Sequence, residues 1–387
     1  MGSRWPTAAL GDVVQNLDSR RIPLSTMQRR SCQGEYPYYG AAGVIDHVDD
    51  YLFEGLHLLV AEDGSVETER GTPVTQLVDG RFWVNNHAHI LRAQSDWDTR
   101  YLYFAMQTLA VRPYLSGSVQ GKLTQQNLNR MRLAWPDEAT RRRIASTLGS
   151  LDDKIKLNRQ MADTLEGIVQ TLYSLLVESS EDVDRESPSL CSLADVAVLA
   201  KRTVNPQSLP DRVFEHYSLP AFDSGRLPQF QRGEAIKSQK TLVPDGAVLL
   251  SKLNPQFPRV WMPELSGEDN AIASTEFLVL TPRRSIPRSF LYCAISSSIF
   301  TRRLQAYVTG TSGSHQRVKP QTVMEMPVPC VSRDVLEEFD RLAGPALERA
   351  SNAIRQGDTL RQMRDALLPP LLDGRIEVPP VADQEVS

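Results

Sequence analysis

The sequence lacks the features that mark several common protein classes. Its 387 residues include only four cysteines, none with the spacing of a zinc site or a disulfide framework, so we expect reduced, intracellular thiols. No apolar run approaches the roughly 20 residues of a membrane span. The first ten residues have no signal-peptide core. We therefore expect a cytoplasmic protein without membrane contact.

Enzyme signatures are also missing. The chain contains no Gly-x-Ser-x-Gly motif, Walker loop or paired-carboxylate motif. His87 and His89 would share one face of a strand, but no third metal ligand is near them in the sequence. We expect these histidines to be polar core or DNA-facing residues, and we expect no metal site.

One short motif favours an alternative. Asn254-Pro255-Gln256-Phe257 resembles the Asn-Pro-Pro-Tyr signature of adenine-N6 methyltransferases, which holds the amino group of a flipped base. However, Gln256 replaces the second proline, and no glycine-rich loop upstream could hold S-adenosylmethionine. The motif thus has two interpretations. Asn254–Phe257 is either part of a single-chain adenine-N6 DNA methyltransferase, or a loop that lies near DNA or within the fold.

Positive charge is scarce overall but locally concentrated. The formal net charge is −4, yet seven Lys and Arg residues lie between Arg112 and Arg143 against two acidic residues. Such a stripe could contact nucleic-acid phosphates even in an acidic chain. A solvated helix face explains the charge equally well.

The clearest positive signal is a helical seam from Asp137 to about Ser179. Its apolar residues recur at alternating steps of four and three, which predicts a coiled coil: Ile144, Leu148, Leu151, Ile155, Ala162, Leu165, Val169, Leu172 and Leu176. Asn158 is the one polar seam position. We expect a helical partner from Ser332 to about Leu372, broken or kinked at Gly344-Pro345.

The chain repeats one plan. Ser192–Ala197 echoes Ala9–Val14, and Asp358-Thr359-Leu360 repeats Asp163-Thr164-Leu165 at an offset of 195. At that offset we expect Leu148, Leu151 and Ile155 to face Ala343, Ala346 and Ala350. The predicted parts are globules at 1–136 and 180–330, the second with a leading linker, and helical regions at 137–179 and 331–387.

The expected fold is therefore α+β, with two tandem globules, two long antiparallel coiled-coil helices and pseudo-two-fold symmetry. A seam from Ile144 to Leu176 would be about 50 Å long at about 1.5 Å per residue. Paired readers of duplex DNA are commonly separated by roughly 34–36 Å or a multiple. This geometry suits a bipartite DNA target, and a coiled-coil scaffold without sequence preference is a weaker alternative.

Several segments resemble the specificity subunits of type I restriction–modification systems: Ser116–Leu123 leading to Met131–Pro136, Arg142–Leu157, Ser251–Pro255 and Leu360–Ile376. The resemblance implies a non-catalytic chain of a phage-defence system, with two target-recognition domains and two helical spacers. It also implies binding to double-stranded DNA, to two methyltransferase subunits and, in the full complex, to motor-nuclease subunits. No cofactor is expected in this chain; S-adenosylmethionine belongs to the methyltransferase partners, and ATP and Mg to the motor-nuclease subunit.

The candidate DNA contacts are polar residues of equivalent loops. Gln pairs bidentately with adenine and Arg or Lys with guanine, while Ser and Lys suit phosphates. The candidates are Ser116, Ser118, Gln120 and Lys122 in the first copy, Ser314, Gln316, Arg317 and Lys319 in the second, and Lys252 and Asn254. The Arg141-Arg142-Arg143 cluster suits either the DNA backbone or an acidic partner.

Overall fold

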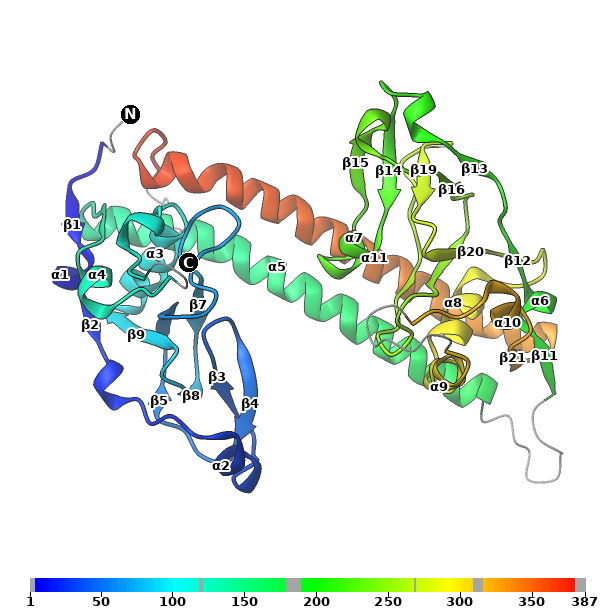
Figure 1. Cartoon of the computed structure of the whole chain (residues 1–387), viewed down its shortest axis with the longest axis horizontal. Coiled ribbons are helices and arrows are strands. Elements are labelled where there is room, and N and C mark those ends of the chain that lie inside the picture. The colour runs from blue at the N-terminus through cyan, green and yellow to red at the C-terminus, as the bar shows by residue number, and fades with distance from the viewer. Residues whose placement is uncertain (1–3, 118–120, 179–188, 268, 309–315, 380–387) are drawn as a thin grey trace, which may run out of the picture. The chain divides into compact units, whose positions relative to one another are not determined.

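The computed structural model describes residues 4–117, 121–178, 189–267, 269–308 and 316–379 (Figure 1). The chain divides into two compact units, of which unit 1 comprises Met1–Lys154 with Thr359–Ser387 and unit 2 comprises Ile155–Asp358. Two long helices, α5 (Glu138–Tyr173) and α11 (Arg333–Leu372), each contribute one part to both units. Each unit is therefore an α+β globule with a pair of helical segments.

Two four-stranded sheets dominate the globule of unit 1. The first is antiparallel, in the order β2 (Val14–Asn16), β9 (Ala88–Ala93), β6 (His57–Ala61) and β7 (Thr75–Val78). The second has the order β4 (Val44–Val48), β3 (Tyr36–Tyr39), β8 (Arg81–Val84) and β5 (Phe53–Glu54), with β3 and β8 parallel. The remaining elements are β1 (Thr7–Ala9), β10 (Arg132–Ala134), α1 (Leu10–Val13), α2 (Thr26–Ser31), α3 (Asp96–Met106) and α4 (Gln125–Asn129).

The globule of unit 2 has the same plan. Its first sheet has the order β12 (Ala197–Leu199), β20 (Phe277–Pro282), β17 (Val248–Ser251) and β18 (Val260–Trp261). Its second has the order β13 (Thr203–Val204), β16 (Lys240–Leu242), β19 (Ala271–Ala273), β14 (Val213–Tyr217) and β15 (Gln229–Arg232). The remaining elements are β11 (Leu190–Ser192), β21 (Pro327–Pro329), α6 (Leu193–Val196), α7 (Leu219–Asp223), α8 (Arg288–Ser296), α9 (Ser298–Ala306) and α10 (Pro320–Met324).

Strand pairing confirms the tandem repeat. β14 and β19 are parallel within an otherwise antiparallel sheet, as β3 and β8 are in unit 1. In each unit a short antiparallel pair, β1–β10 or β11–β21, joins the first strand to the segment that precedes a long helix. Such an unusual pairing pattern, repeated in the same order, indicates one duplicated α+β domain.

Strand β6 shows how each globule buries its core. All five of its residues are buried. Successive side chains of a strand point to opposite faces, so both faces of β6 are covered. Leu58 and Val60 belong to the cluster that includes residues of α3, α5 and α11. Leu59 lies in a second cluster with Phe82 and other residues of the second sheet.

The helical segments pair in antiparallel fashion, as predicted. In unit 1, Ile144 and Leu148 near the start of α5 share a buried cluster with Leu371 near the end of α11. In unit 2, Val169 near the end of α5 shares a buried cluster with Phe339 near the start of α11. Each seam is formed by the apolar stripe that the sequence displays.

The expected facing of equivalent seam residues is wrong. Leu148 packs with Leu368 and Leu371 in unit 1, whereas Ala343 lies in a cluster of unit 2. Antiparallel pairing brings together residues that are not equivalent in the repeat. Close packing of small side chains does occur, but it joins Ala350 to Ala162.

Of the predicted break or kink at Gly344-Pro345, the break is wrong, because α11 continues through both residues for 40 residues in all. Proline in a helix interior removes one backbone hydrogen bond and costs about 3 kcal/mol. Pro345 is on the exposed side of the helix, so water can reach the carbonyl group that loses its donor. Ala343 and Leu347, on either side, are buried and hold the helix in place.

Asn158 is a polar residue within the helical seam of unit 2. Its side chain is fully buried, and neither amide atom has a hydrogen-bond partner among the described residues. Gly357 of α11 lies opposite Asn158, because a Cβ atom on this glycine would be 3.8 Å from the Cβ of Asn158. Burying an unpaired amide costs about 1–3 kcal/mol, and a seam asparagine is one way in which helices specify their register.

None of the helices in the described ranges combines the length and apolar composition that a bilayer crossing requires. Most of the predicted linker at the start of 180–330 lies outside the described residues.

Candidate nucleic-acid interface

The candidate loop of unit 1 is closed at its base by Ser116 and Lys122. Their backbones exchange two hydrogen bonds of 2.9 and 2.8 Å, and the Ser116 hydroxyl donates to the Lys122 carbonyl at 3.0 Å. The Leu123 N–H donates to the carbonyl of Glu62, the first residue after β6, at 2.9 Å. The Ser116 side chain therefore stabilises the loop, and the candidates Ser118 and Gln120 lie outside the described residues.

A carboxylate orients the cation of this loop. The Lys122 ammonium lies 3.1 Å from Glu62, which also accepts a hydrogen bond of 2.7 Å from Arg21. Burial opposes ionisation of Glu62, but the hydrogen bonds from Arg21 and Lys122 hold its pKa below the usual value. The Lys122 side chain remains 49% exposed, so it is both oriented and accessible.

The equivalent junction of unit 2 brings four candidate residues together. Leu253 and Arg317 form an isolated β-bridge. The Asn254 N–H donates to the Gln316 carbonyl at 2.8 Å, and the Val318 N–H donates to the Lys252 carbonyl at 3.1 Å. Lys252, Asn254, Gln316 and Arg317 thus lie at one junction. Lys319 is exposed immediately before α10, and Ser314 lies outside the described residues.

Both junctions share a tethered cation. Arg317 donates to both carboxylate oxygens of Glu276 at 3.0 and 2.9 Å, and its side chain is 44% exposed. In unit 1 the equivalent cation, Lys122, pairs with Glu62, a carboxylate from a different position of the fold. Glu62 and Glu276 were not among the sequence candidates, because their pairing depends on strands that are distant in sequence. Each unit therefore presents one pre-oriented cation at an equivalent loop.

The Asn254 segment does not have the surroundings of a methyltransferase motif. Asn254 adopts φ 48°, and its side-chain oxygen is buried without a described partner. The Pro255 carbonyl accepts a hydrogen bond of 3.5 Å from Gln305. The two groups that would hold a flipped base are thus turned inward, while Phe257 is 60% exposed. This geometry favours a structural turn at the junction.

Two of the three arginines at the start of α5, Arg141 and Arg142, differ in their surroundings. Arg141 is buried, donates to Asp98 at 2.6 Å and lies 4.2 Å from the Trp135 ring. It is therefore an internal ion-pair residue of unit 1. Arg142 is exposed and lies 5.7 Å from the Trp97 ring, so it remains available to DNA or to a partner.

His89 has acidic neighbours that the sequence order conceals. Asp18 Oδ2 lies 2.5 Å from His89 Nδ1, and Glu62 Oε2 lies 3.9 Å from the same atom. The expectation that no third ligand lies near the histidines is thus wrong, because Asp18, Glu62 and His89 gather as a metal site would require. However, His89 Nε2 lies 2.7 Å from the Leu123 carbonyl. Both ring nitrogens thus contact oxygen atoms, so a metal ion would have to displace one of these contacts.

His87 is separate from this group. It is half exposed and pairs with Asp63 at 2.6 Å, in the loop that follows β6. It therefore lies at the surface of the same end of unit 1.

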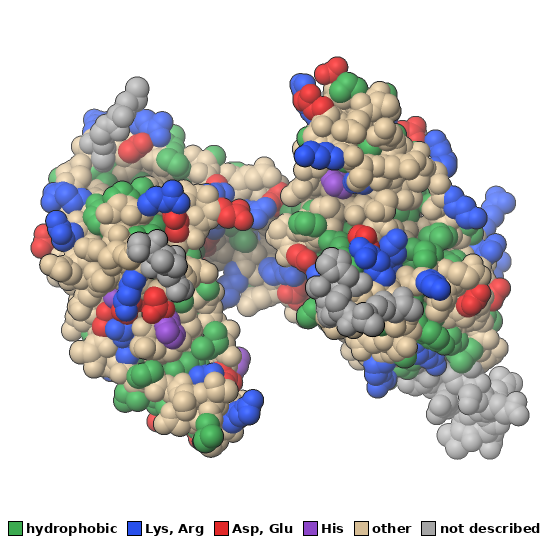
Figure 2. All heavy atoms as spheres, viewed as in Figure 1, with side chains coloured by type: hydrophobic (Ala, Val, Ile, Leu, Met, Phe, Trp, Pro, Cys, Tyr) green, Lys and Arg blue, Asp and Glu red, His purple; other side chains and the backbone are tan. Residues whose placement is uncertain are grey.

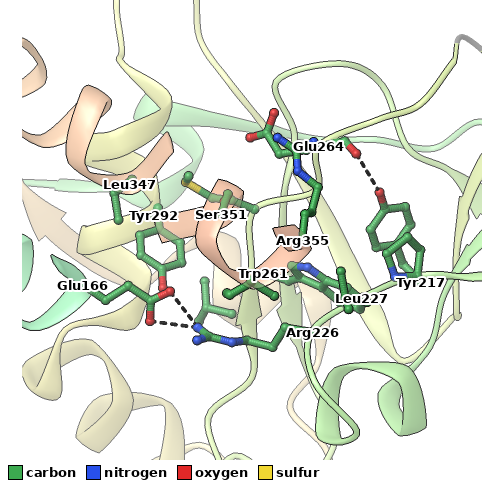
Figure 3. A pocket seen from close by; sticks show the side chains of 14 residues that line it. Glu166, Tyr217, Arg226, Leu227, Trp261, Glu264, Tyr292, Leu347, Ser351 and Arg355 are labelled. Carbon is green, nitrogen blue, oxygen red and sulfur yellow. Dashed lines mark hydrogen bonds and ion pairs between the residues drawn. The ribbon is translucent and has the colours of Figure 1, made fainter. Parts of the chain in front are cut away.

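A small pocket of unit 2 lies between the globule and the helical segments (Figure 3). Arg226 donates to both oxygens of Glu166 at 2.7 and 2.8 Å, which attaches the globule to α5. The free space of about 50 Å³ is far below the roughly 300–1,000 Å³ of small-molecule sites. This pocket is part of the contact between the globule of unit 2 and its helical segments, and it is too small for S-adenosylmethionine.

The surface charge is mixed. Figure 2 shows Lys and Arg side chains interspersed with Asp and Glu on the visible face of both units. The described residues of this face therefore form no continuous basic surface of the kind that binds nucleic acid by charge alone.

Comparison with known proteins agrees with these features. Residues 2–167 match the family model of the type I restriction modification DNA specificity domain. A putative type I restriction enzyme specificity subunit from Haemophilus influenzae is 32% identical over 150 residues, which are 39% of this chain and 38% of that relative. The match thus spans well under two thirds of that relative. The MjaIX specificity subunit from Methanocaldococcus jannaschii is 22% identical over 310 residues, covering 72% of this chain and 69% of that relative.

The fold has a solved counterpart. The S subunit of a type I restriction–modification system from M. genitalium aligns with a TM-score of 0.64 at 14% identity, covering 96% of each chain. At that identity the likeness concerns the fold alone. Together, these findings show that residues 2–167 are similar to the type I restriction modification DNA specificity domain and that the chain has the fold of a solved S subunit.

Proposed function

We propose that this chain is the non-catalytic DNA-recognition subunit of a type I restriction–modification complex. Each globule would read one half of a bipartite target in duplex DNA. The observation that carries the proposal is the duplicated junction with one tethered, half-exposed cation in each unit, Lys122 and Arg317. The similarity of residues 2–167 to the type I restriction modification DNA specificity domain supports the same conclusion.

The chemistry of the junction suits base recognition. A guanidinium held flat by two hydrogen bonds has lost most of its rotational freedom before binding, so less entropy is lost when it meets a base edge. Arg to guanine is the commonest specific contact in the major groove. Lys122 is held through one carboxylate contact and suits a phosphate or a guanine.

The helical segments would determine the distance between the half-sites. α5 contains 36 residues, which correspond to about 54 Å at about 1.5 Å per residue. We propose residues 1–136 and 180–330 as target-recognition domains 1 and 2, and regions 137–179 and 331–387 as the spacers between them.

The partners would carry the chemistry. We propose two methyltransferase subunits that bind S-adenosylmethionine, and motor-nuclease subunits that bind ATP and Mg in the full cytoplasmic complex. The α5 segment of unit 2 offers an apolar surface for such a partner. Leu157 and Ile168 are 54% and 57% exposed, and the step of 11 residues between them places both on one helical face. Leu175 is 63% exposed and lies in the π-helical segment Ser174–Glu178 that follows α5.

A domain exchange tests the assignment. Residues 1–136 would be replaced by those of another specificity subunit, and the methylome of cells that carry the chimaera with its methyltransferase partner would be sequenced. We expect one half of the methylated target to change while the other half and the gap stay the same. A change in both halves, or methylation without sequence preference, would contradict the modular assignment.

A single residue should report on the second domain. Arg317→Ala should lower affinity for the cognate duplex about tenfold, or relax the choice at one base position, because a guanidinium contact with a base is lost. Binding to duplexes with single-base changes in the second half-site measures this. Arg302→Ala, which removes an exposed arginine from α9, is the matched control and should bind like the wild type. Equal binding by both variants would remove Arg317 from the interface.

A further inference from the structure

We propose that His89 is a positioning residue for DNA recognition by unit 1: its doubly protonated ring joins Asp18 to the carbonyl of Leu123 and so fixes Lys122, the neighbouring residue, in place. The inference rests on the proposed function. It names a residue that does not touch DNA and acts through the hydrogen-bonded ends of the loop, Ser116 and Lys122.

The contacts of the ring define its protonation state. The His89 side chain is 1% exposed, so water does not replace its partners. Its Nδ1 lies 2.5 Å from an Asp18 carboxylate oxygen and its Nε2 lies 2.7 Å from the Leu123 carbonyl. The Leu123 carbonyl can only accept, and the Asp18 carboxylate also accepts a hydrogen bond of 2.9 Å from the Ile90 N–H and lies 3.6 Å from the Arg21 guanidinium, which favours its ionised, accepting form. Both nitrogens must therefore donate, and the ring is an imidazolium.

The ring belongs to a cluster of five charged residues, which we call the anchor cluster: Asp18, Arg21, Glu62, His89 and Lys122. Arg21 lies 3.6 Å from Asp18 and 2.7 Å from Glu62, and Lys122 lies 3.1 Å from Glu62. Asp18 also accepts a hydrogen bond of 2.9 Å from the Ile90 N–H. Among the described residues, Asp18 and Glu62 are the carboxylates that face the ring, and Arg21 is the nearest cation beyond them. The loop base is thus held by side chains as well as by its backbone bonds.

Unit 2 closes the same junction without this cluster. Equivalent backbone hydrogen bonds align the two units. The bond from the Leu17 N–H to the Ile90 carbonyl corresponds to the bond from Ala200 to Val279. Likewise, the bond from the Leu123 N–H to the Glu62 carbonyl corresponds to the bond from Val318 to Lys252. The position of His89 is then occupied by Leu278, that of Asp18 by Lys201 and that of Glu62 by Lys252. Because the fold forms with an apolar residue at this position, the anchor cluster is a feature of unit 1 and not a requirement of the domain.

The cluster should make one half of the recognition pH-dependent. Burial opposes the charged ring, but the bonds to Asp18 and Leu123 raise the pKa of His89 above its usual value. The contribution of the ring is complete below the ordinary histidine pKa of about 6.5 and is lost as the pH rises through the raised value. Above that value one nitrogen faces an acceptor without a proton, so one bond of the loop base disappears.

The test uses the full chain with its methyltransferase partner and two sets of duplexes, each with one half-site scrambled. His89→Gln should lower affinity about fivefold at neutral pH, as expected for the loss of one hydrogen bond. This loss of affinity should be seen only with duplexes that keep the half-site assigned to residues 1–136 by the domain exchange. The fall in wild-type affinity with rising pH should disappear in the variant. His57→Gln removes another buried histidine of unit 1, which bonds to Gly55 at 2.9 Å away from the loop, and should leave the pH profile unchanged.

The outcomes separate the two proposals. If the wild type does not distinguish intact from scrambled first half-sites, the proposed function fails and this inference fails with it. If the wild type distinguishes them and His89→Gln does so equally, with the same pH profile, this inference alone is overturned. Nitrogen-15 spectra of the wild type should show two protonated ring nitrogens for His89 at neutral pH, and a neutral ring would also overturn it. Should the variant not fold, a flat wild-type pH profile at the first half-site decides against the proposal.

Discussion

Replacing Arg141 with alanine should destabilise unit 1 by about 3–5 kcal/mol, the range measured when one partner of a buried ion pair is removed. The guanidinium donates to Asp98 and to the Pro136 carbonyl, both at 2.6 Å, and covers the Trp135 ring. Without it, Asp98 would remain a carboxylate that is 3% exposed and has lost its counter-ion. Denaturant unfolding of the full chain, followed by Trp fluorescence, would measure the change.

The neighbouring arginine provides the control. Arg142 is exposed and has only a distant contact, 5.7 Å from Trp97, so Arg142→Ala should change the free energy of unfolding by no more than about 0.5 kcal/mol. Equal unfolding midpoints for the two variants would show that the Arg141–Asp98 pair does not hold the start of α5 to its globule.

Replacing Phe339 with alanine should destabilise unit 2 by about 3–5 kcal/mol. The Phe339 ring is fully buried and lies 5.8 Å from that of Tyr173 on α5. The truncation leaves a cavity one and a half turns before Pro345, where the helix already lacks a backbone bond. We therefore expect amide hydrogen exchange in α11 to accelerate most between residues 334 and 347. Leu342→Ala is the control, because Leu342 is 43% exposed. Slow exchange in this segment despite Phe339→Ala would mean that local helix propensity alone is sufficient to hold it.

The sequence predicted the helices well because their signal is periodic and local. The steps of four and three from Ile144 to Leu176 specify which face of α5 is buried, and the antiparallel arrangement followed from the duplicated plan. The break at Gly344-Pro345 was predicted from propensity alone. Propensity is a weak guide where buried residues flank the site, as Ala343 and Leu347 do here.

The candidate site could be predicted only in part. The resemblance located the loops that carry Lys122 and Arg317, because their neighbouring residues form recognisable motifs. Their carboxylate partners, Glu62 and Glu276, are 60 and 41 residues away in the chain and belong to no motif. His89 and Asp18 are 71 residues apart, and only the pairing of β2 with β9 brings them together. Contacts between distant strands leave no local pattern in a single sequence.

The anchor cluster draws all of its members from residues 18–122, upstream of the first long helix. A genetic crossover at the start of that helix would consequently transfer the complete anchor cluster into another gene. The recipient's first target-recognition domain would then gain pH dependence together with a new base preference, while the recognition by unit 2 would stay unchanged.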